Sequence, residues 1–273
     1  MLTLVIQLFN CRSPSSTAYR NKCEFSIGYM TDSSGDQPKR KVSVGFRLSS
    51  YKSGSVEVVS LNSLADTTST LPHISPRMIS LVTKLEKYVE ASGVQPYCSL
   101  ERKGNWRTVM MRTARGGSPA DRVGSYEENI KEMMVVVTCD PMDLSPETIA
   151  RLKSELELLF SDETCGVTSL YLHLQPARKE AGQTDPAPSL LSGSGCIQER
   201  LLGRQFSVSP QAFFQVNTPA AEILYSLAGE VADLNKNTTL VDICCGTGTI
   251  GILMWCNFFF NLFICPLYRS VSL

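Results

Sequence analysis

The chain lacks a net charge, because its 273 residues carry 26 lysines and arginines against 26 aspartates and glutamates. A strong basic excess is the usual mark of a nucleic-acid-binding protein, and the chain as a whole does not have it. The balance is a cancellation between two halves. Residues 1–115 carry 16 basic and 8 acidic side chains, net +8, whereas residues 116–273 carry 10 and 18, net −8. This asymmetry indicates that the first half meets a polyanion.

Two further absences concern cysteine pairs and the N-terminus. The chain has 10 cysteines but no CxxC pair, which argues against a disulfide framework or a zinc site and favours reduced thiols. The opening residues, MLTLVIQLFNCR, have no basic region before the apolar run and no small-residue cleavage site, so they make a poor secretory signal. A content of 43% hydrophobic and 19% charged residues excludes a disordered or fibrous chain. We expect a folded protein of the cytoplasm or nucleus.

One long run lacks charge altogether. Residues 250–268 read IGILMWCNFFFNLFICPLY, and their length suits a membrane-spanning helix. Asn257, Asn261 and Pro266 argue against that interpretation, as does the glycine-rich motif just before the run. A third interpretation is that a premature or alternative terminus makes the segment foreign to the fold. A tail-anchored membrane protein therefore stays open as an alternative.

The remaining chain predicts alternating strands and helices. Strands are expected at residues 19–30, 42–48, 56–61, 106–113, 133–138, 169–174 and 206–208, and helices at 76–92, 145–160 and 218–234. Ser145 is the expected cap of the second helix, and Asn217 or Thr218 that of the third. The first pair of strands predicts a hairpin with a long loop. The paired methionines at 110–111 and 133–134 are expected in the core.

The most informative segment is TLVDICCGTGTI, residues 239–250. An apolar strand ends at Asp242, and the glycine turn that follows leads into a helix. Glycines at such a turn let the backbone approach a ligand beside the amides of the helix N-terminus. The third glycine of the dinucleotide motif is missing, as is the GK[ST] of a P-loop, so an S-adenosylmethionine site fits the pattern best. A purely structural tight turn remains the alternative.

The segments FSVSPQAFFQVNTPAAEILY (206–225) and LVDICCGTGTIGI (240–252) resemble the tRNA (uracil-5-)-methyltransferase family, in particular its animal homologues. YRNKCEF (19–25), VGFRLSSYKSGS (44–55) and WRTVMMRT (106–113) are similar in the same order. The resemblance covers roughly residues 15–252. It implies methyl transfer from S-adenosylmethionine to C5 of a tRNA uridine, typically in the T-loop. It also implies a cofactor site formed by Gln215, Asp242, Gly246, Thr247, Gly248 and Thr249.

The resemblance also implies what this chain should contain and does not. Uracil C5 becomes nucleophilic when a thiolate adds at C6, and the family supplies that thiol from an SCNP motif. The SCNP motif, the DPPR segment and the acidic end of the second strand do not occur in this sequence. Cys244 and Cys245 are interpreted as small buried packing residues. We therefore expect an inactive, truncated product, with a non-catalytic tRNA-binding fragment as the alternative.

The predicted fold is an α+β RNA-binding domain followed by the incomplete start of an α/β class I S-adenosylmethionine-dependent methyltransferase domain of Rossmann-like fold. We expect a poorly defined leader at 1–18, the RNA-binding domain at 19–175, a Pro-, Gly- and Ser-rich linker at 176–200, the start of the methyltransferase domain at 201–254 and an apolar tail outside the family at 255–273.

The basic first half is the expected RNA-facing surface. Its candidate RNA-binding residues are Arg20, Lys22, Arg47, Lys52, Trp106, Arg107 and Arg112. Lysine and arginine would neutralise phosphates, and aromatic rings such as Trp106 would stack on bases. For any single residue, a solvated strand face is the alternative interpretation. We expect a monomer that binds tRNA and holds no metal ion.

Overall fold

The computed structural model describes residues 12–32, 39–48, 56–63, 71–116, 124–178, 184–243, 245–258 and 261–264. The strands are β1 (Lys22–Asp32), β2 (Lys39–Arg47), β3 (Val58–Ser60), β4 (Trp106–Ala114), β5 (Glu132–Cys139), β6 (Ser169–Leu174), β7 (Ser189–Gly193), β8 (Ile197–Leu201), β9 (Arg204–Val208), β10 (Thr239–Asp242) and β11 (Asn261–Ile264). The α-helices are α3 (Pro76–Ala91), α4 (Pro146–Phe160), α5 (Thr218–Val231) and α6 (Thr249–Phe258). Short 3-10 turns are η2 (Leu61–Ser63), η4 (Glu127–Asn129) and η5 (Glu163–Cys165).

A mixed sheet of seven strands organises the chain, in the order β3-β2-β1-β4-β5-β6-β7. Neighbouring strands are antiparallel except for β5 and β6, which are parallel and joined through α4. Up to β6 the order of strands and helices is the one predicted from the sequence. The caps are confirmed as well, since Ser145 accepts from the amide of Thr148 and Asn217 accepts from the amide of Ala220.

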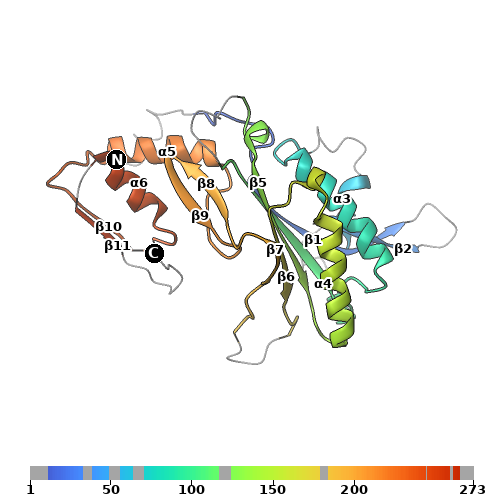
Figure 1. Cartoon of the computed structure of the whole chain (residues 1–273). Helices are drawn as coiled ribbons and strands as arrows, with labels where there is room; N and C mark the ends of the chain where they lie inside the picture. Colours follow the sequence, from blue (N-terminus) through green and yellow to red (C-terminus); the bar gives the residue numbers. More distant parts are fainter. Residues whose placement is uncertain are drawn as a thin grey trace.

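The central strands β4, β5 and β6 are covered on both faces. Helices α3 and α4 lie on one face, and β8, β9 and α5 lie on the other (Figure 1). Side chains of a strand alternate between its two faces, so neighbouring residues of β4 and β5 enter different cores. Met111 and Met133 pack under the helices, whereas Met110 and Met134 pack under the β8–β9 hairpin. This double burial explains the apolar runs VMM within β4 and MMVVV within β5 and confirms the four methionines as core residues.

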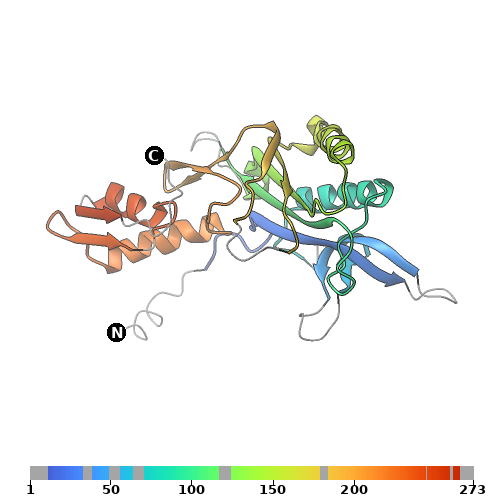
Figure 2. The same cartoon turned by 90° about the horizontal axis from the view of Figure 1, so that it is seen from below.

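The C-terminal elements form a separate layer. β10 and β11 pair in parallel, and α6 connects them. Together with α5 they lie at one end of the molecule, away from α3 and α4 (Figure 2). This strand–helix–strand unit is typical of an α/β domain. Residues of the uncharged run lie in both α6 and β11 rather than in one helix. No helix of the described part of the chain is long and apolar enough to cross a membrane.

The structure differs from the loop or linker predicted over residues 176–200. Two strands lie in this range, β7 at the edge of the large sheet and β8 in the hairpin with β9. As an edge strand, β7 is mostly exposed, so its sequence SLLSG shows no apolar alternation. Because of the Pro, Gly and Ser content of this range, the sequence did not predict β7, a strand that forms by pairing with β6.

Candidate functional site

The turn between β10 and α6 is built on two glycines. Gly246 and Gly248 have φ angles of +56° and +71°, which residues with a Cβ rarely adopt. The amide of Gly248 donates to the carbonyl of Cys245 over 2.8 Å and closes the turn. Apart from its two neighbours in the chain, no described residue has an atom within 4 Å of a Cβ placed at Gly246. The loop therefore presents open backbone next to the N-terminus of α6, where anionic and polar ligand groups are favoured.

A cavity of about 100 Å³ opens between this loop and the segment that precedes α5. Its lining residues are Leu201, Phe213, Phe214, Gln215, Tyr225, Cys245, Gly246, Thr247, Thr249 and Ile250. Four of the predicted cofactor residues, Gln215, Gly246, Thr247 and Thr249, thus meet at one cavity, although Gln215 comes from a different segment of the chain. Asp242 and Gly248 lie beside the cavity and do not line it.

Asp242 carries an unsatisfied oxygen. Its Oδ2 is buried and has no hydrogen-bond partner among the residues that the structure describes. An unpaired buried carboxylate oxygen is costly, so such groups normally meet a donor. Its place at the carboxyl end of β10 is where ligands of open α/β sheets bind. The open glycine loop and this unpartnered oxygen together fit a ligand that has hydroxyl or amino donors.

Of the two loop cysteines, Cys245 lies among the described residues, and its burial differs from the prediction. Cys245 is half-buried and lines the cavity, so its interpretation as a buried packing residue is wrong. The chain before the loop is itself exposed, since Val241 of β10 and Ile243 just after it are 56% and 60% exposed. Cys244 lies outside the described residues.

Two of the predicted RNA-binding residues are buried. Trp106 is 0% exposed and donates from Nε1 to Ser92 Oγ over 3.2 Å, so it offers no ring for a base. Arg112 is 3% exposed and donates to the carbonyls of Ser209 and Ala212. Both predictions are wrong because β4 is a central strand with both faces covered, a position that alternating charges and aromatics did not reveal.

The other candidates have mixed surroundings. Arg47 is exposed. Arg20, Lys22 and Arg107 are half-buried, and Arg107 donates to the backbone and side chain of Gln175 over 3.2 and 3.1 Å. Burial, followed by the charge of Arg112, lowers the pKa of Lys22. Lys52 lies outside the described residues.

A second cavity, of about 270 Å³, lies on the basic half. Arg40 and Arg47 line it together with Tyr29 and Tyr97. The Arg40 guanidinium lies 5.9 Å from the centre of the Tyr29 ring and pairs with Glu101 over 2.5 Å. We name these four residues the basic aromatic pocket. The two tyrosines were missed in the sequence, because neither has a basic residue as its neighbour along the chain.

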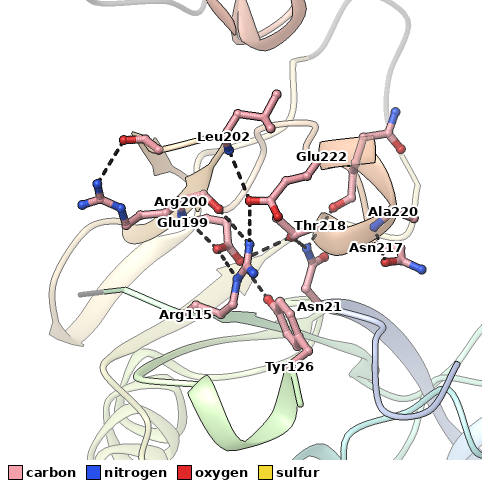
Figure 3. Close-up of polar contacts among 12 residues, drawn as sticks. Asn21, Arg115, Tyr126, Glu199, Arg200, Leu202, Asn217, Thr218, Ala220 and Glu222 are labelled. Carbon is pink, nitrogen blue, oxygen red and sulfur yellow. Dashed lines mark hydrogen bonds and ion pairs between the residues drawn. The ribbon is translucent and has the colours of Figure 1, made fainter. Parts of the chain in front are cut away.

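A buried polar cluster joins the large sheet to α5 (Figure 3). Arg115 at the end of β4 pairs with Glu199 of β8 over 3.1 Å and with Glu222 of α5 over 3.5 Å. Glu199 also accepts from the Tyr126 hydroxyl over 2.8 Å and from Thr218 over 3.4 Å. Burial raises the pKa of Glu199, and the Arg115 charge acts against that rise. The cluster fixes α5, and with it the Gln215 side of the cavity, to the first half of the chain.

Within the described ranges, no group of three or more His, Cys, Asp or Glu residues is placed to hold a metal ion.

Comparison with known proteins relates the chain to tRNA-modifying enzymes. It is 36% identical over 245 residues to tRNA (uracil-5-)-methyltransferase homolog A of Mus musculus and 34% identical over 243 residues to homolog B of the same species. These alignments cover 89% and 88% of the chain but only 36% and 44% of the relatives, so the chain spans less than half of their length. No protein-family profile matches the chain.

A solved structure has a similar fold. The crystal structure of Pyrococcus abyssi tRNA (uracil-54, C5)-methyltransferase in complex with S-adenosyl-L-homocysteine matches with a TM-score of 0.60, over 99% of this chain and 62% of that one. The sequence identity is 15%, so this likeness concerns the fold alone.

Proposed function

The chain belongs to the tRNA (uracil-5-)-methyltransferase family, and from this premise we propose that it binds S-adenosylmethionine at the glycine-loop cavity and tRNA through its basic half. Together these binding sites would serve transfer of a methyl group to C5 of a uridine. The observation that carries the proposal is the meeting of Gln215 with the glycine loop at one cavity, beside the unpartnered oxygen of Asp242.

Each side of the cavity has a role in this proposal. Bound S-adenosylmethionine would supply an electrophilic methyl group on its sulfonium. The open backbone at Gly246 and the first amides of α6 would hold polar groups of the ligand. Asp242 Oδ2 would accept from a ligand hydroxyl or amine, and the Gln215 amide would complete the opposite wall. The apolar rings of Phe214 and Tyr225 would exclude water.

We further propose that this chain by itself does not complete methyl transfer. Activation of uracil C5 requires a thiolate, and by the family resemblance that thiol belongs to an SCNP segment, which this sequence does not contain. Cys245 is the one cysteine among the described residues that line the cavity, and we assign it no catalytic role. The chain would then act as a cofactor- and tRNA-binding unit.

Binding of tritiated S-adenosylmethionine, measured by equilibrium dialysis, tests the cofactor site. Gln215→Ala should weaken binding about tenfold, since it removes polar contacts worth about 1.4 kcal/mol. Gln211→Ala is the matched control, because Gln211 is exposed, lies four residues earlier and does not line the cavity. An unmodified chain that binds no cofactor would contradict the proposal.

The same labelled cofactor tests turnover. With T-loop RNA as acceptor, no tritium should reach the RNA. Label transfer that disappears in Cys245→Ala would contradict the proposed inactivity and assign the nucleophile to that thiol.

The tRNA interface is tested separately by filter binding over a salt series. Arg40→Ala and Arg47→Ala should each weaken tRNA binding and reduce the dependence of the logarithm of affinity on the logarithm of salt concentration by about one. Arg151→Ala is the control, since this half-exposed arginine lies on α4 and pairs with Glu155 of the same helix. Equal effects of all three substitutions would contradict an interface at the basic aromatic pocket.

A further inference from the structure

The segment from Ser209 to Thr218 links β9 to α5 and carries Gln215, yet most of it belongs to no helix or strand. Backbone carbonyls in such a segment need donors from elsewhere when they are buried. Several of these donors come from the first half of the chain. They belong to Asn21, which directly precedes β1, and to Arg112 of β4. Arg112 lies opposite Lys22 of β1 in the sheet.

Asn21 makes three contacts with this segment. Its Nδ2 donates to the carbonyl of Gln215 over 2.8 Å and to Oγ1 of Thr218 over 2.9 Å. Its backbone amide donates to the carbonyl of Val216 over 2.8 Å. Asn21 and Thr218 are 3% and 0% exposed, and Figure 3 shows Asn21 reaching the first turn of α5. Asn21 thus holds the backbone of Gln215 itself.

Arg112 holds the earlier part of the segment. Its Nη2 donates to the carbonyl of Ala212 over 2.9 Å and its Nη1 to that of Ser209 over 3.4 Å. The side chain is buried, its Nε has no hydrogen-bond partner, and it forms no ion pair among the described residues. Burial lowers the pKa of Arg112 to about 10. A buried cation without a carboxylate destabilises the fold, so its retention calls for another explanation.

We propose that Asn21 and Arg112 are positioning residues that fix the Ser209–Thr218 segment so that Gln215 faces the glycine loop. This inference rests on the proposed cofactor site. The sequence predicted RNA-binding roles for Arg20, Lys22 and Arg112; the proposal gives Arg112, and the neighbouring Asn21, a task on the side of the glycine-loop cavity instead. Neither side chain lines the cavity, so each acts through the backbone of the segment.

The test measures S-adenosylhomocysteine affinity of the full chain by isothermal titration calorimetry. Asn21→Ala should weaken binding about tenfold, because the Gln215 backbone loses its donor. Asn105→Ala is a matched control. Asn105 also donates from Nδ2 to two backbone carbonyls, those of Asp140 and Met142. None of these three residues lines the cavity. Asn105→Ala should leave the affinity within about twofold of the unmodified chain.

Hydrogen exchange separates positioning from general destabilisation. In Asn21→Ala, amides of residues 209–218 should exchange faster, whereas those of α3 and α4 should keep their protection. Should Asn21→Ala not fold, Arg112→Lys provides the second test, since it keeps the buried charge but loses the forked pair of donors. Its expected result is the same loss of affinity with the same local change in exchange.

Three outcomes are distinguished. An unmodified chain that does not bind S-adenosylhomocysteine contradicts the proposed function itself. An unmodified chain that binds, with Asn21→Ala and Arg112→Lys binding equally well, overturns the positioning role. The role is also overturned if affinity falls in both Asn21→Ala and Asn105→Ala together with faster exchange throughout the sheet, because that pattern describes loss of stability alone.

Discussion

The Arg115–Glu199 pair is the contact of the buried cluster whose removal should have the largest effect. Arg115 and Glu199 are 7% and 2% exposed, and the bond from Nε to Oε1 is 3.1 Å. Breaking a buried ion pair by removing one partner costs about 3–5 kcal/mol when the other charge stays buried without compensation. We therefore expect Arg115→Met to lower the free energy of unfolding by about that amount, and Glu199→Gln by less, because Arg115 keeps its longer contact with Glu222.

The double variant shows whether the two residues act on one another. In the double variant neither charge of the pair remains, so no buried charge is left without this partner. The double variant should therefore be more stable, by about 2 kcal/mol, than the sum of the two single effects predicts. Urea unfolding followed by circular dichroism gives all four values. The exposed pair Arg151–Glu155, 45% and 36% exposed, is the control, and its loss should cost about 0.5 kcal/mol.

The dependence on pH provides a separate check. Burial already raises the pKa of Glu199, and removal of the Arg115 charge should raise it further. A carboxyl whose pKa is higher in the folded state than in the unfolded state contributes its full stability at pH values below the unfolded-state pKa. This contribution is lost as the pH rises through the folded-state pKa. As the pH rises above about 4.3, the ordinary pKa of a glutamate, Arg115→Met should thus lose stability relative to the unmodified chain, by up to about 1.4 kcal/mol per pH unit. The coupling between Arg115 and Glu199 would be refuted if the stability losses of the two single variants add up in the double variant and the stability difference of Arg115→Met does not change with pH.

Three further predictions concern the described core and helices. Trp106→Phe should destabilise the fold by about 1–3 kcal/mol and leave tRNA affinity unchanged in filter binding, since the ring is fully buried; a selective loss of RNA binding would contradict this placement. Ser145→Ala should cost about 1 kcal/mol in urea unfolding, because the α4 amide of Thr148 loses its cap, and no change would show that the cap is dispensable. Burial raises the pKa of Cys23 to about 11, so the thiol stays protonated in the folded state while it ionises in the unfolded one; stability should fall by up to about 3 kcal/mol as pH rises from 9 to 11, and Cys23→Ala should remove that part of the fall.

Much of the fold was predictable from local patterns. Helix α3 has a proline at its start and apolar residues at helical spacing, and α4 has Ser145 as its cap, so both helices were predicted to within one residue or so. The glycine turn after Asp242 was predicted as well, because positive φ angles at Gly246 and Gly248 require glycine. These features depend on residues that are close in the sequence.

The same patterns could not show which strands are central. The basic residues and aromatics of the first half predicted an RNA-facing surface, with a solvated strand face as the alternative for single residues, yet Arg112 and Trp106 are enclosed. Trp106 is covered on the side of α3 and donates to Ser92, just after that helix. Arg112 is covered by the segment after β9, about 100 residues away in the sequence, where it donates to Ser209 and Ala212. The edge strand β7 was missed for the opposite reason, since its exposure leaves no apolar alternation.

The sequence by itself determined the order of strands and helices up to β6, the glycine turn and the family, because each depends on short-range spacing or on motifs that keep their order along the chain. Only the tertiary structure decided which basic residues remain exposed and which hold the cofactor side. The contacts of Asn21 with Gln215 and of Arg115 with Glu199 join residues 194 and 84 positions apart. Such contacts arise when sheet and hairpin pack together and bury polar groups that must then find partners, and no local pattern records that choice.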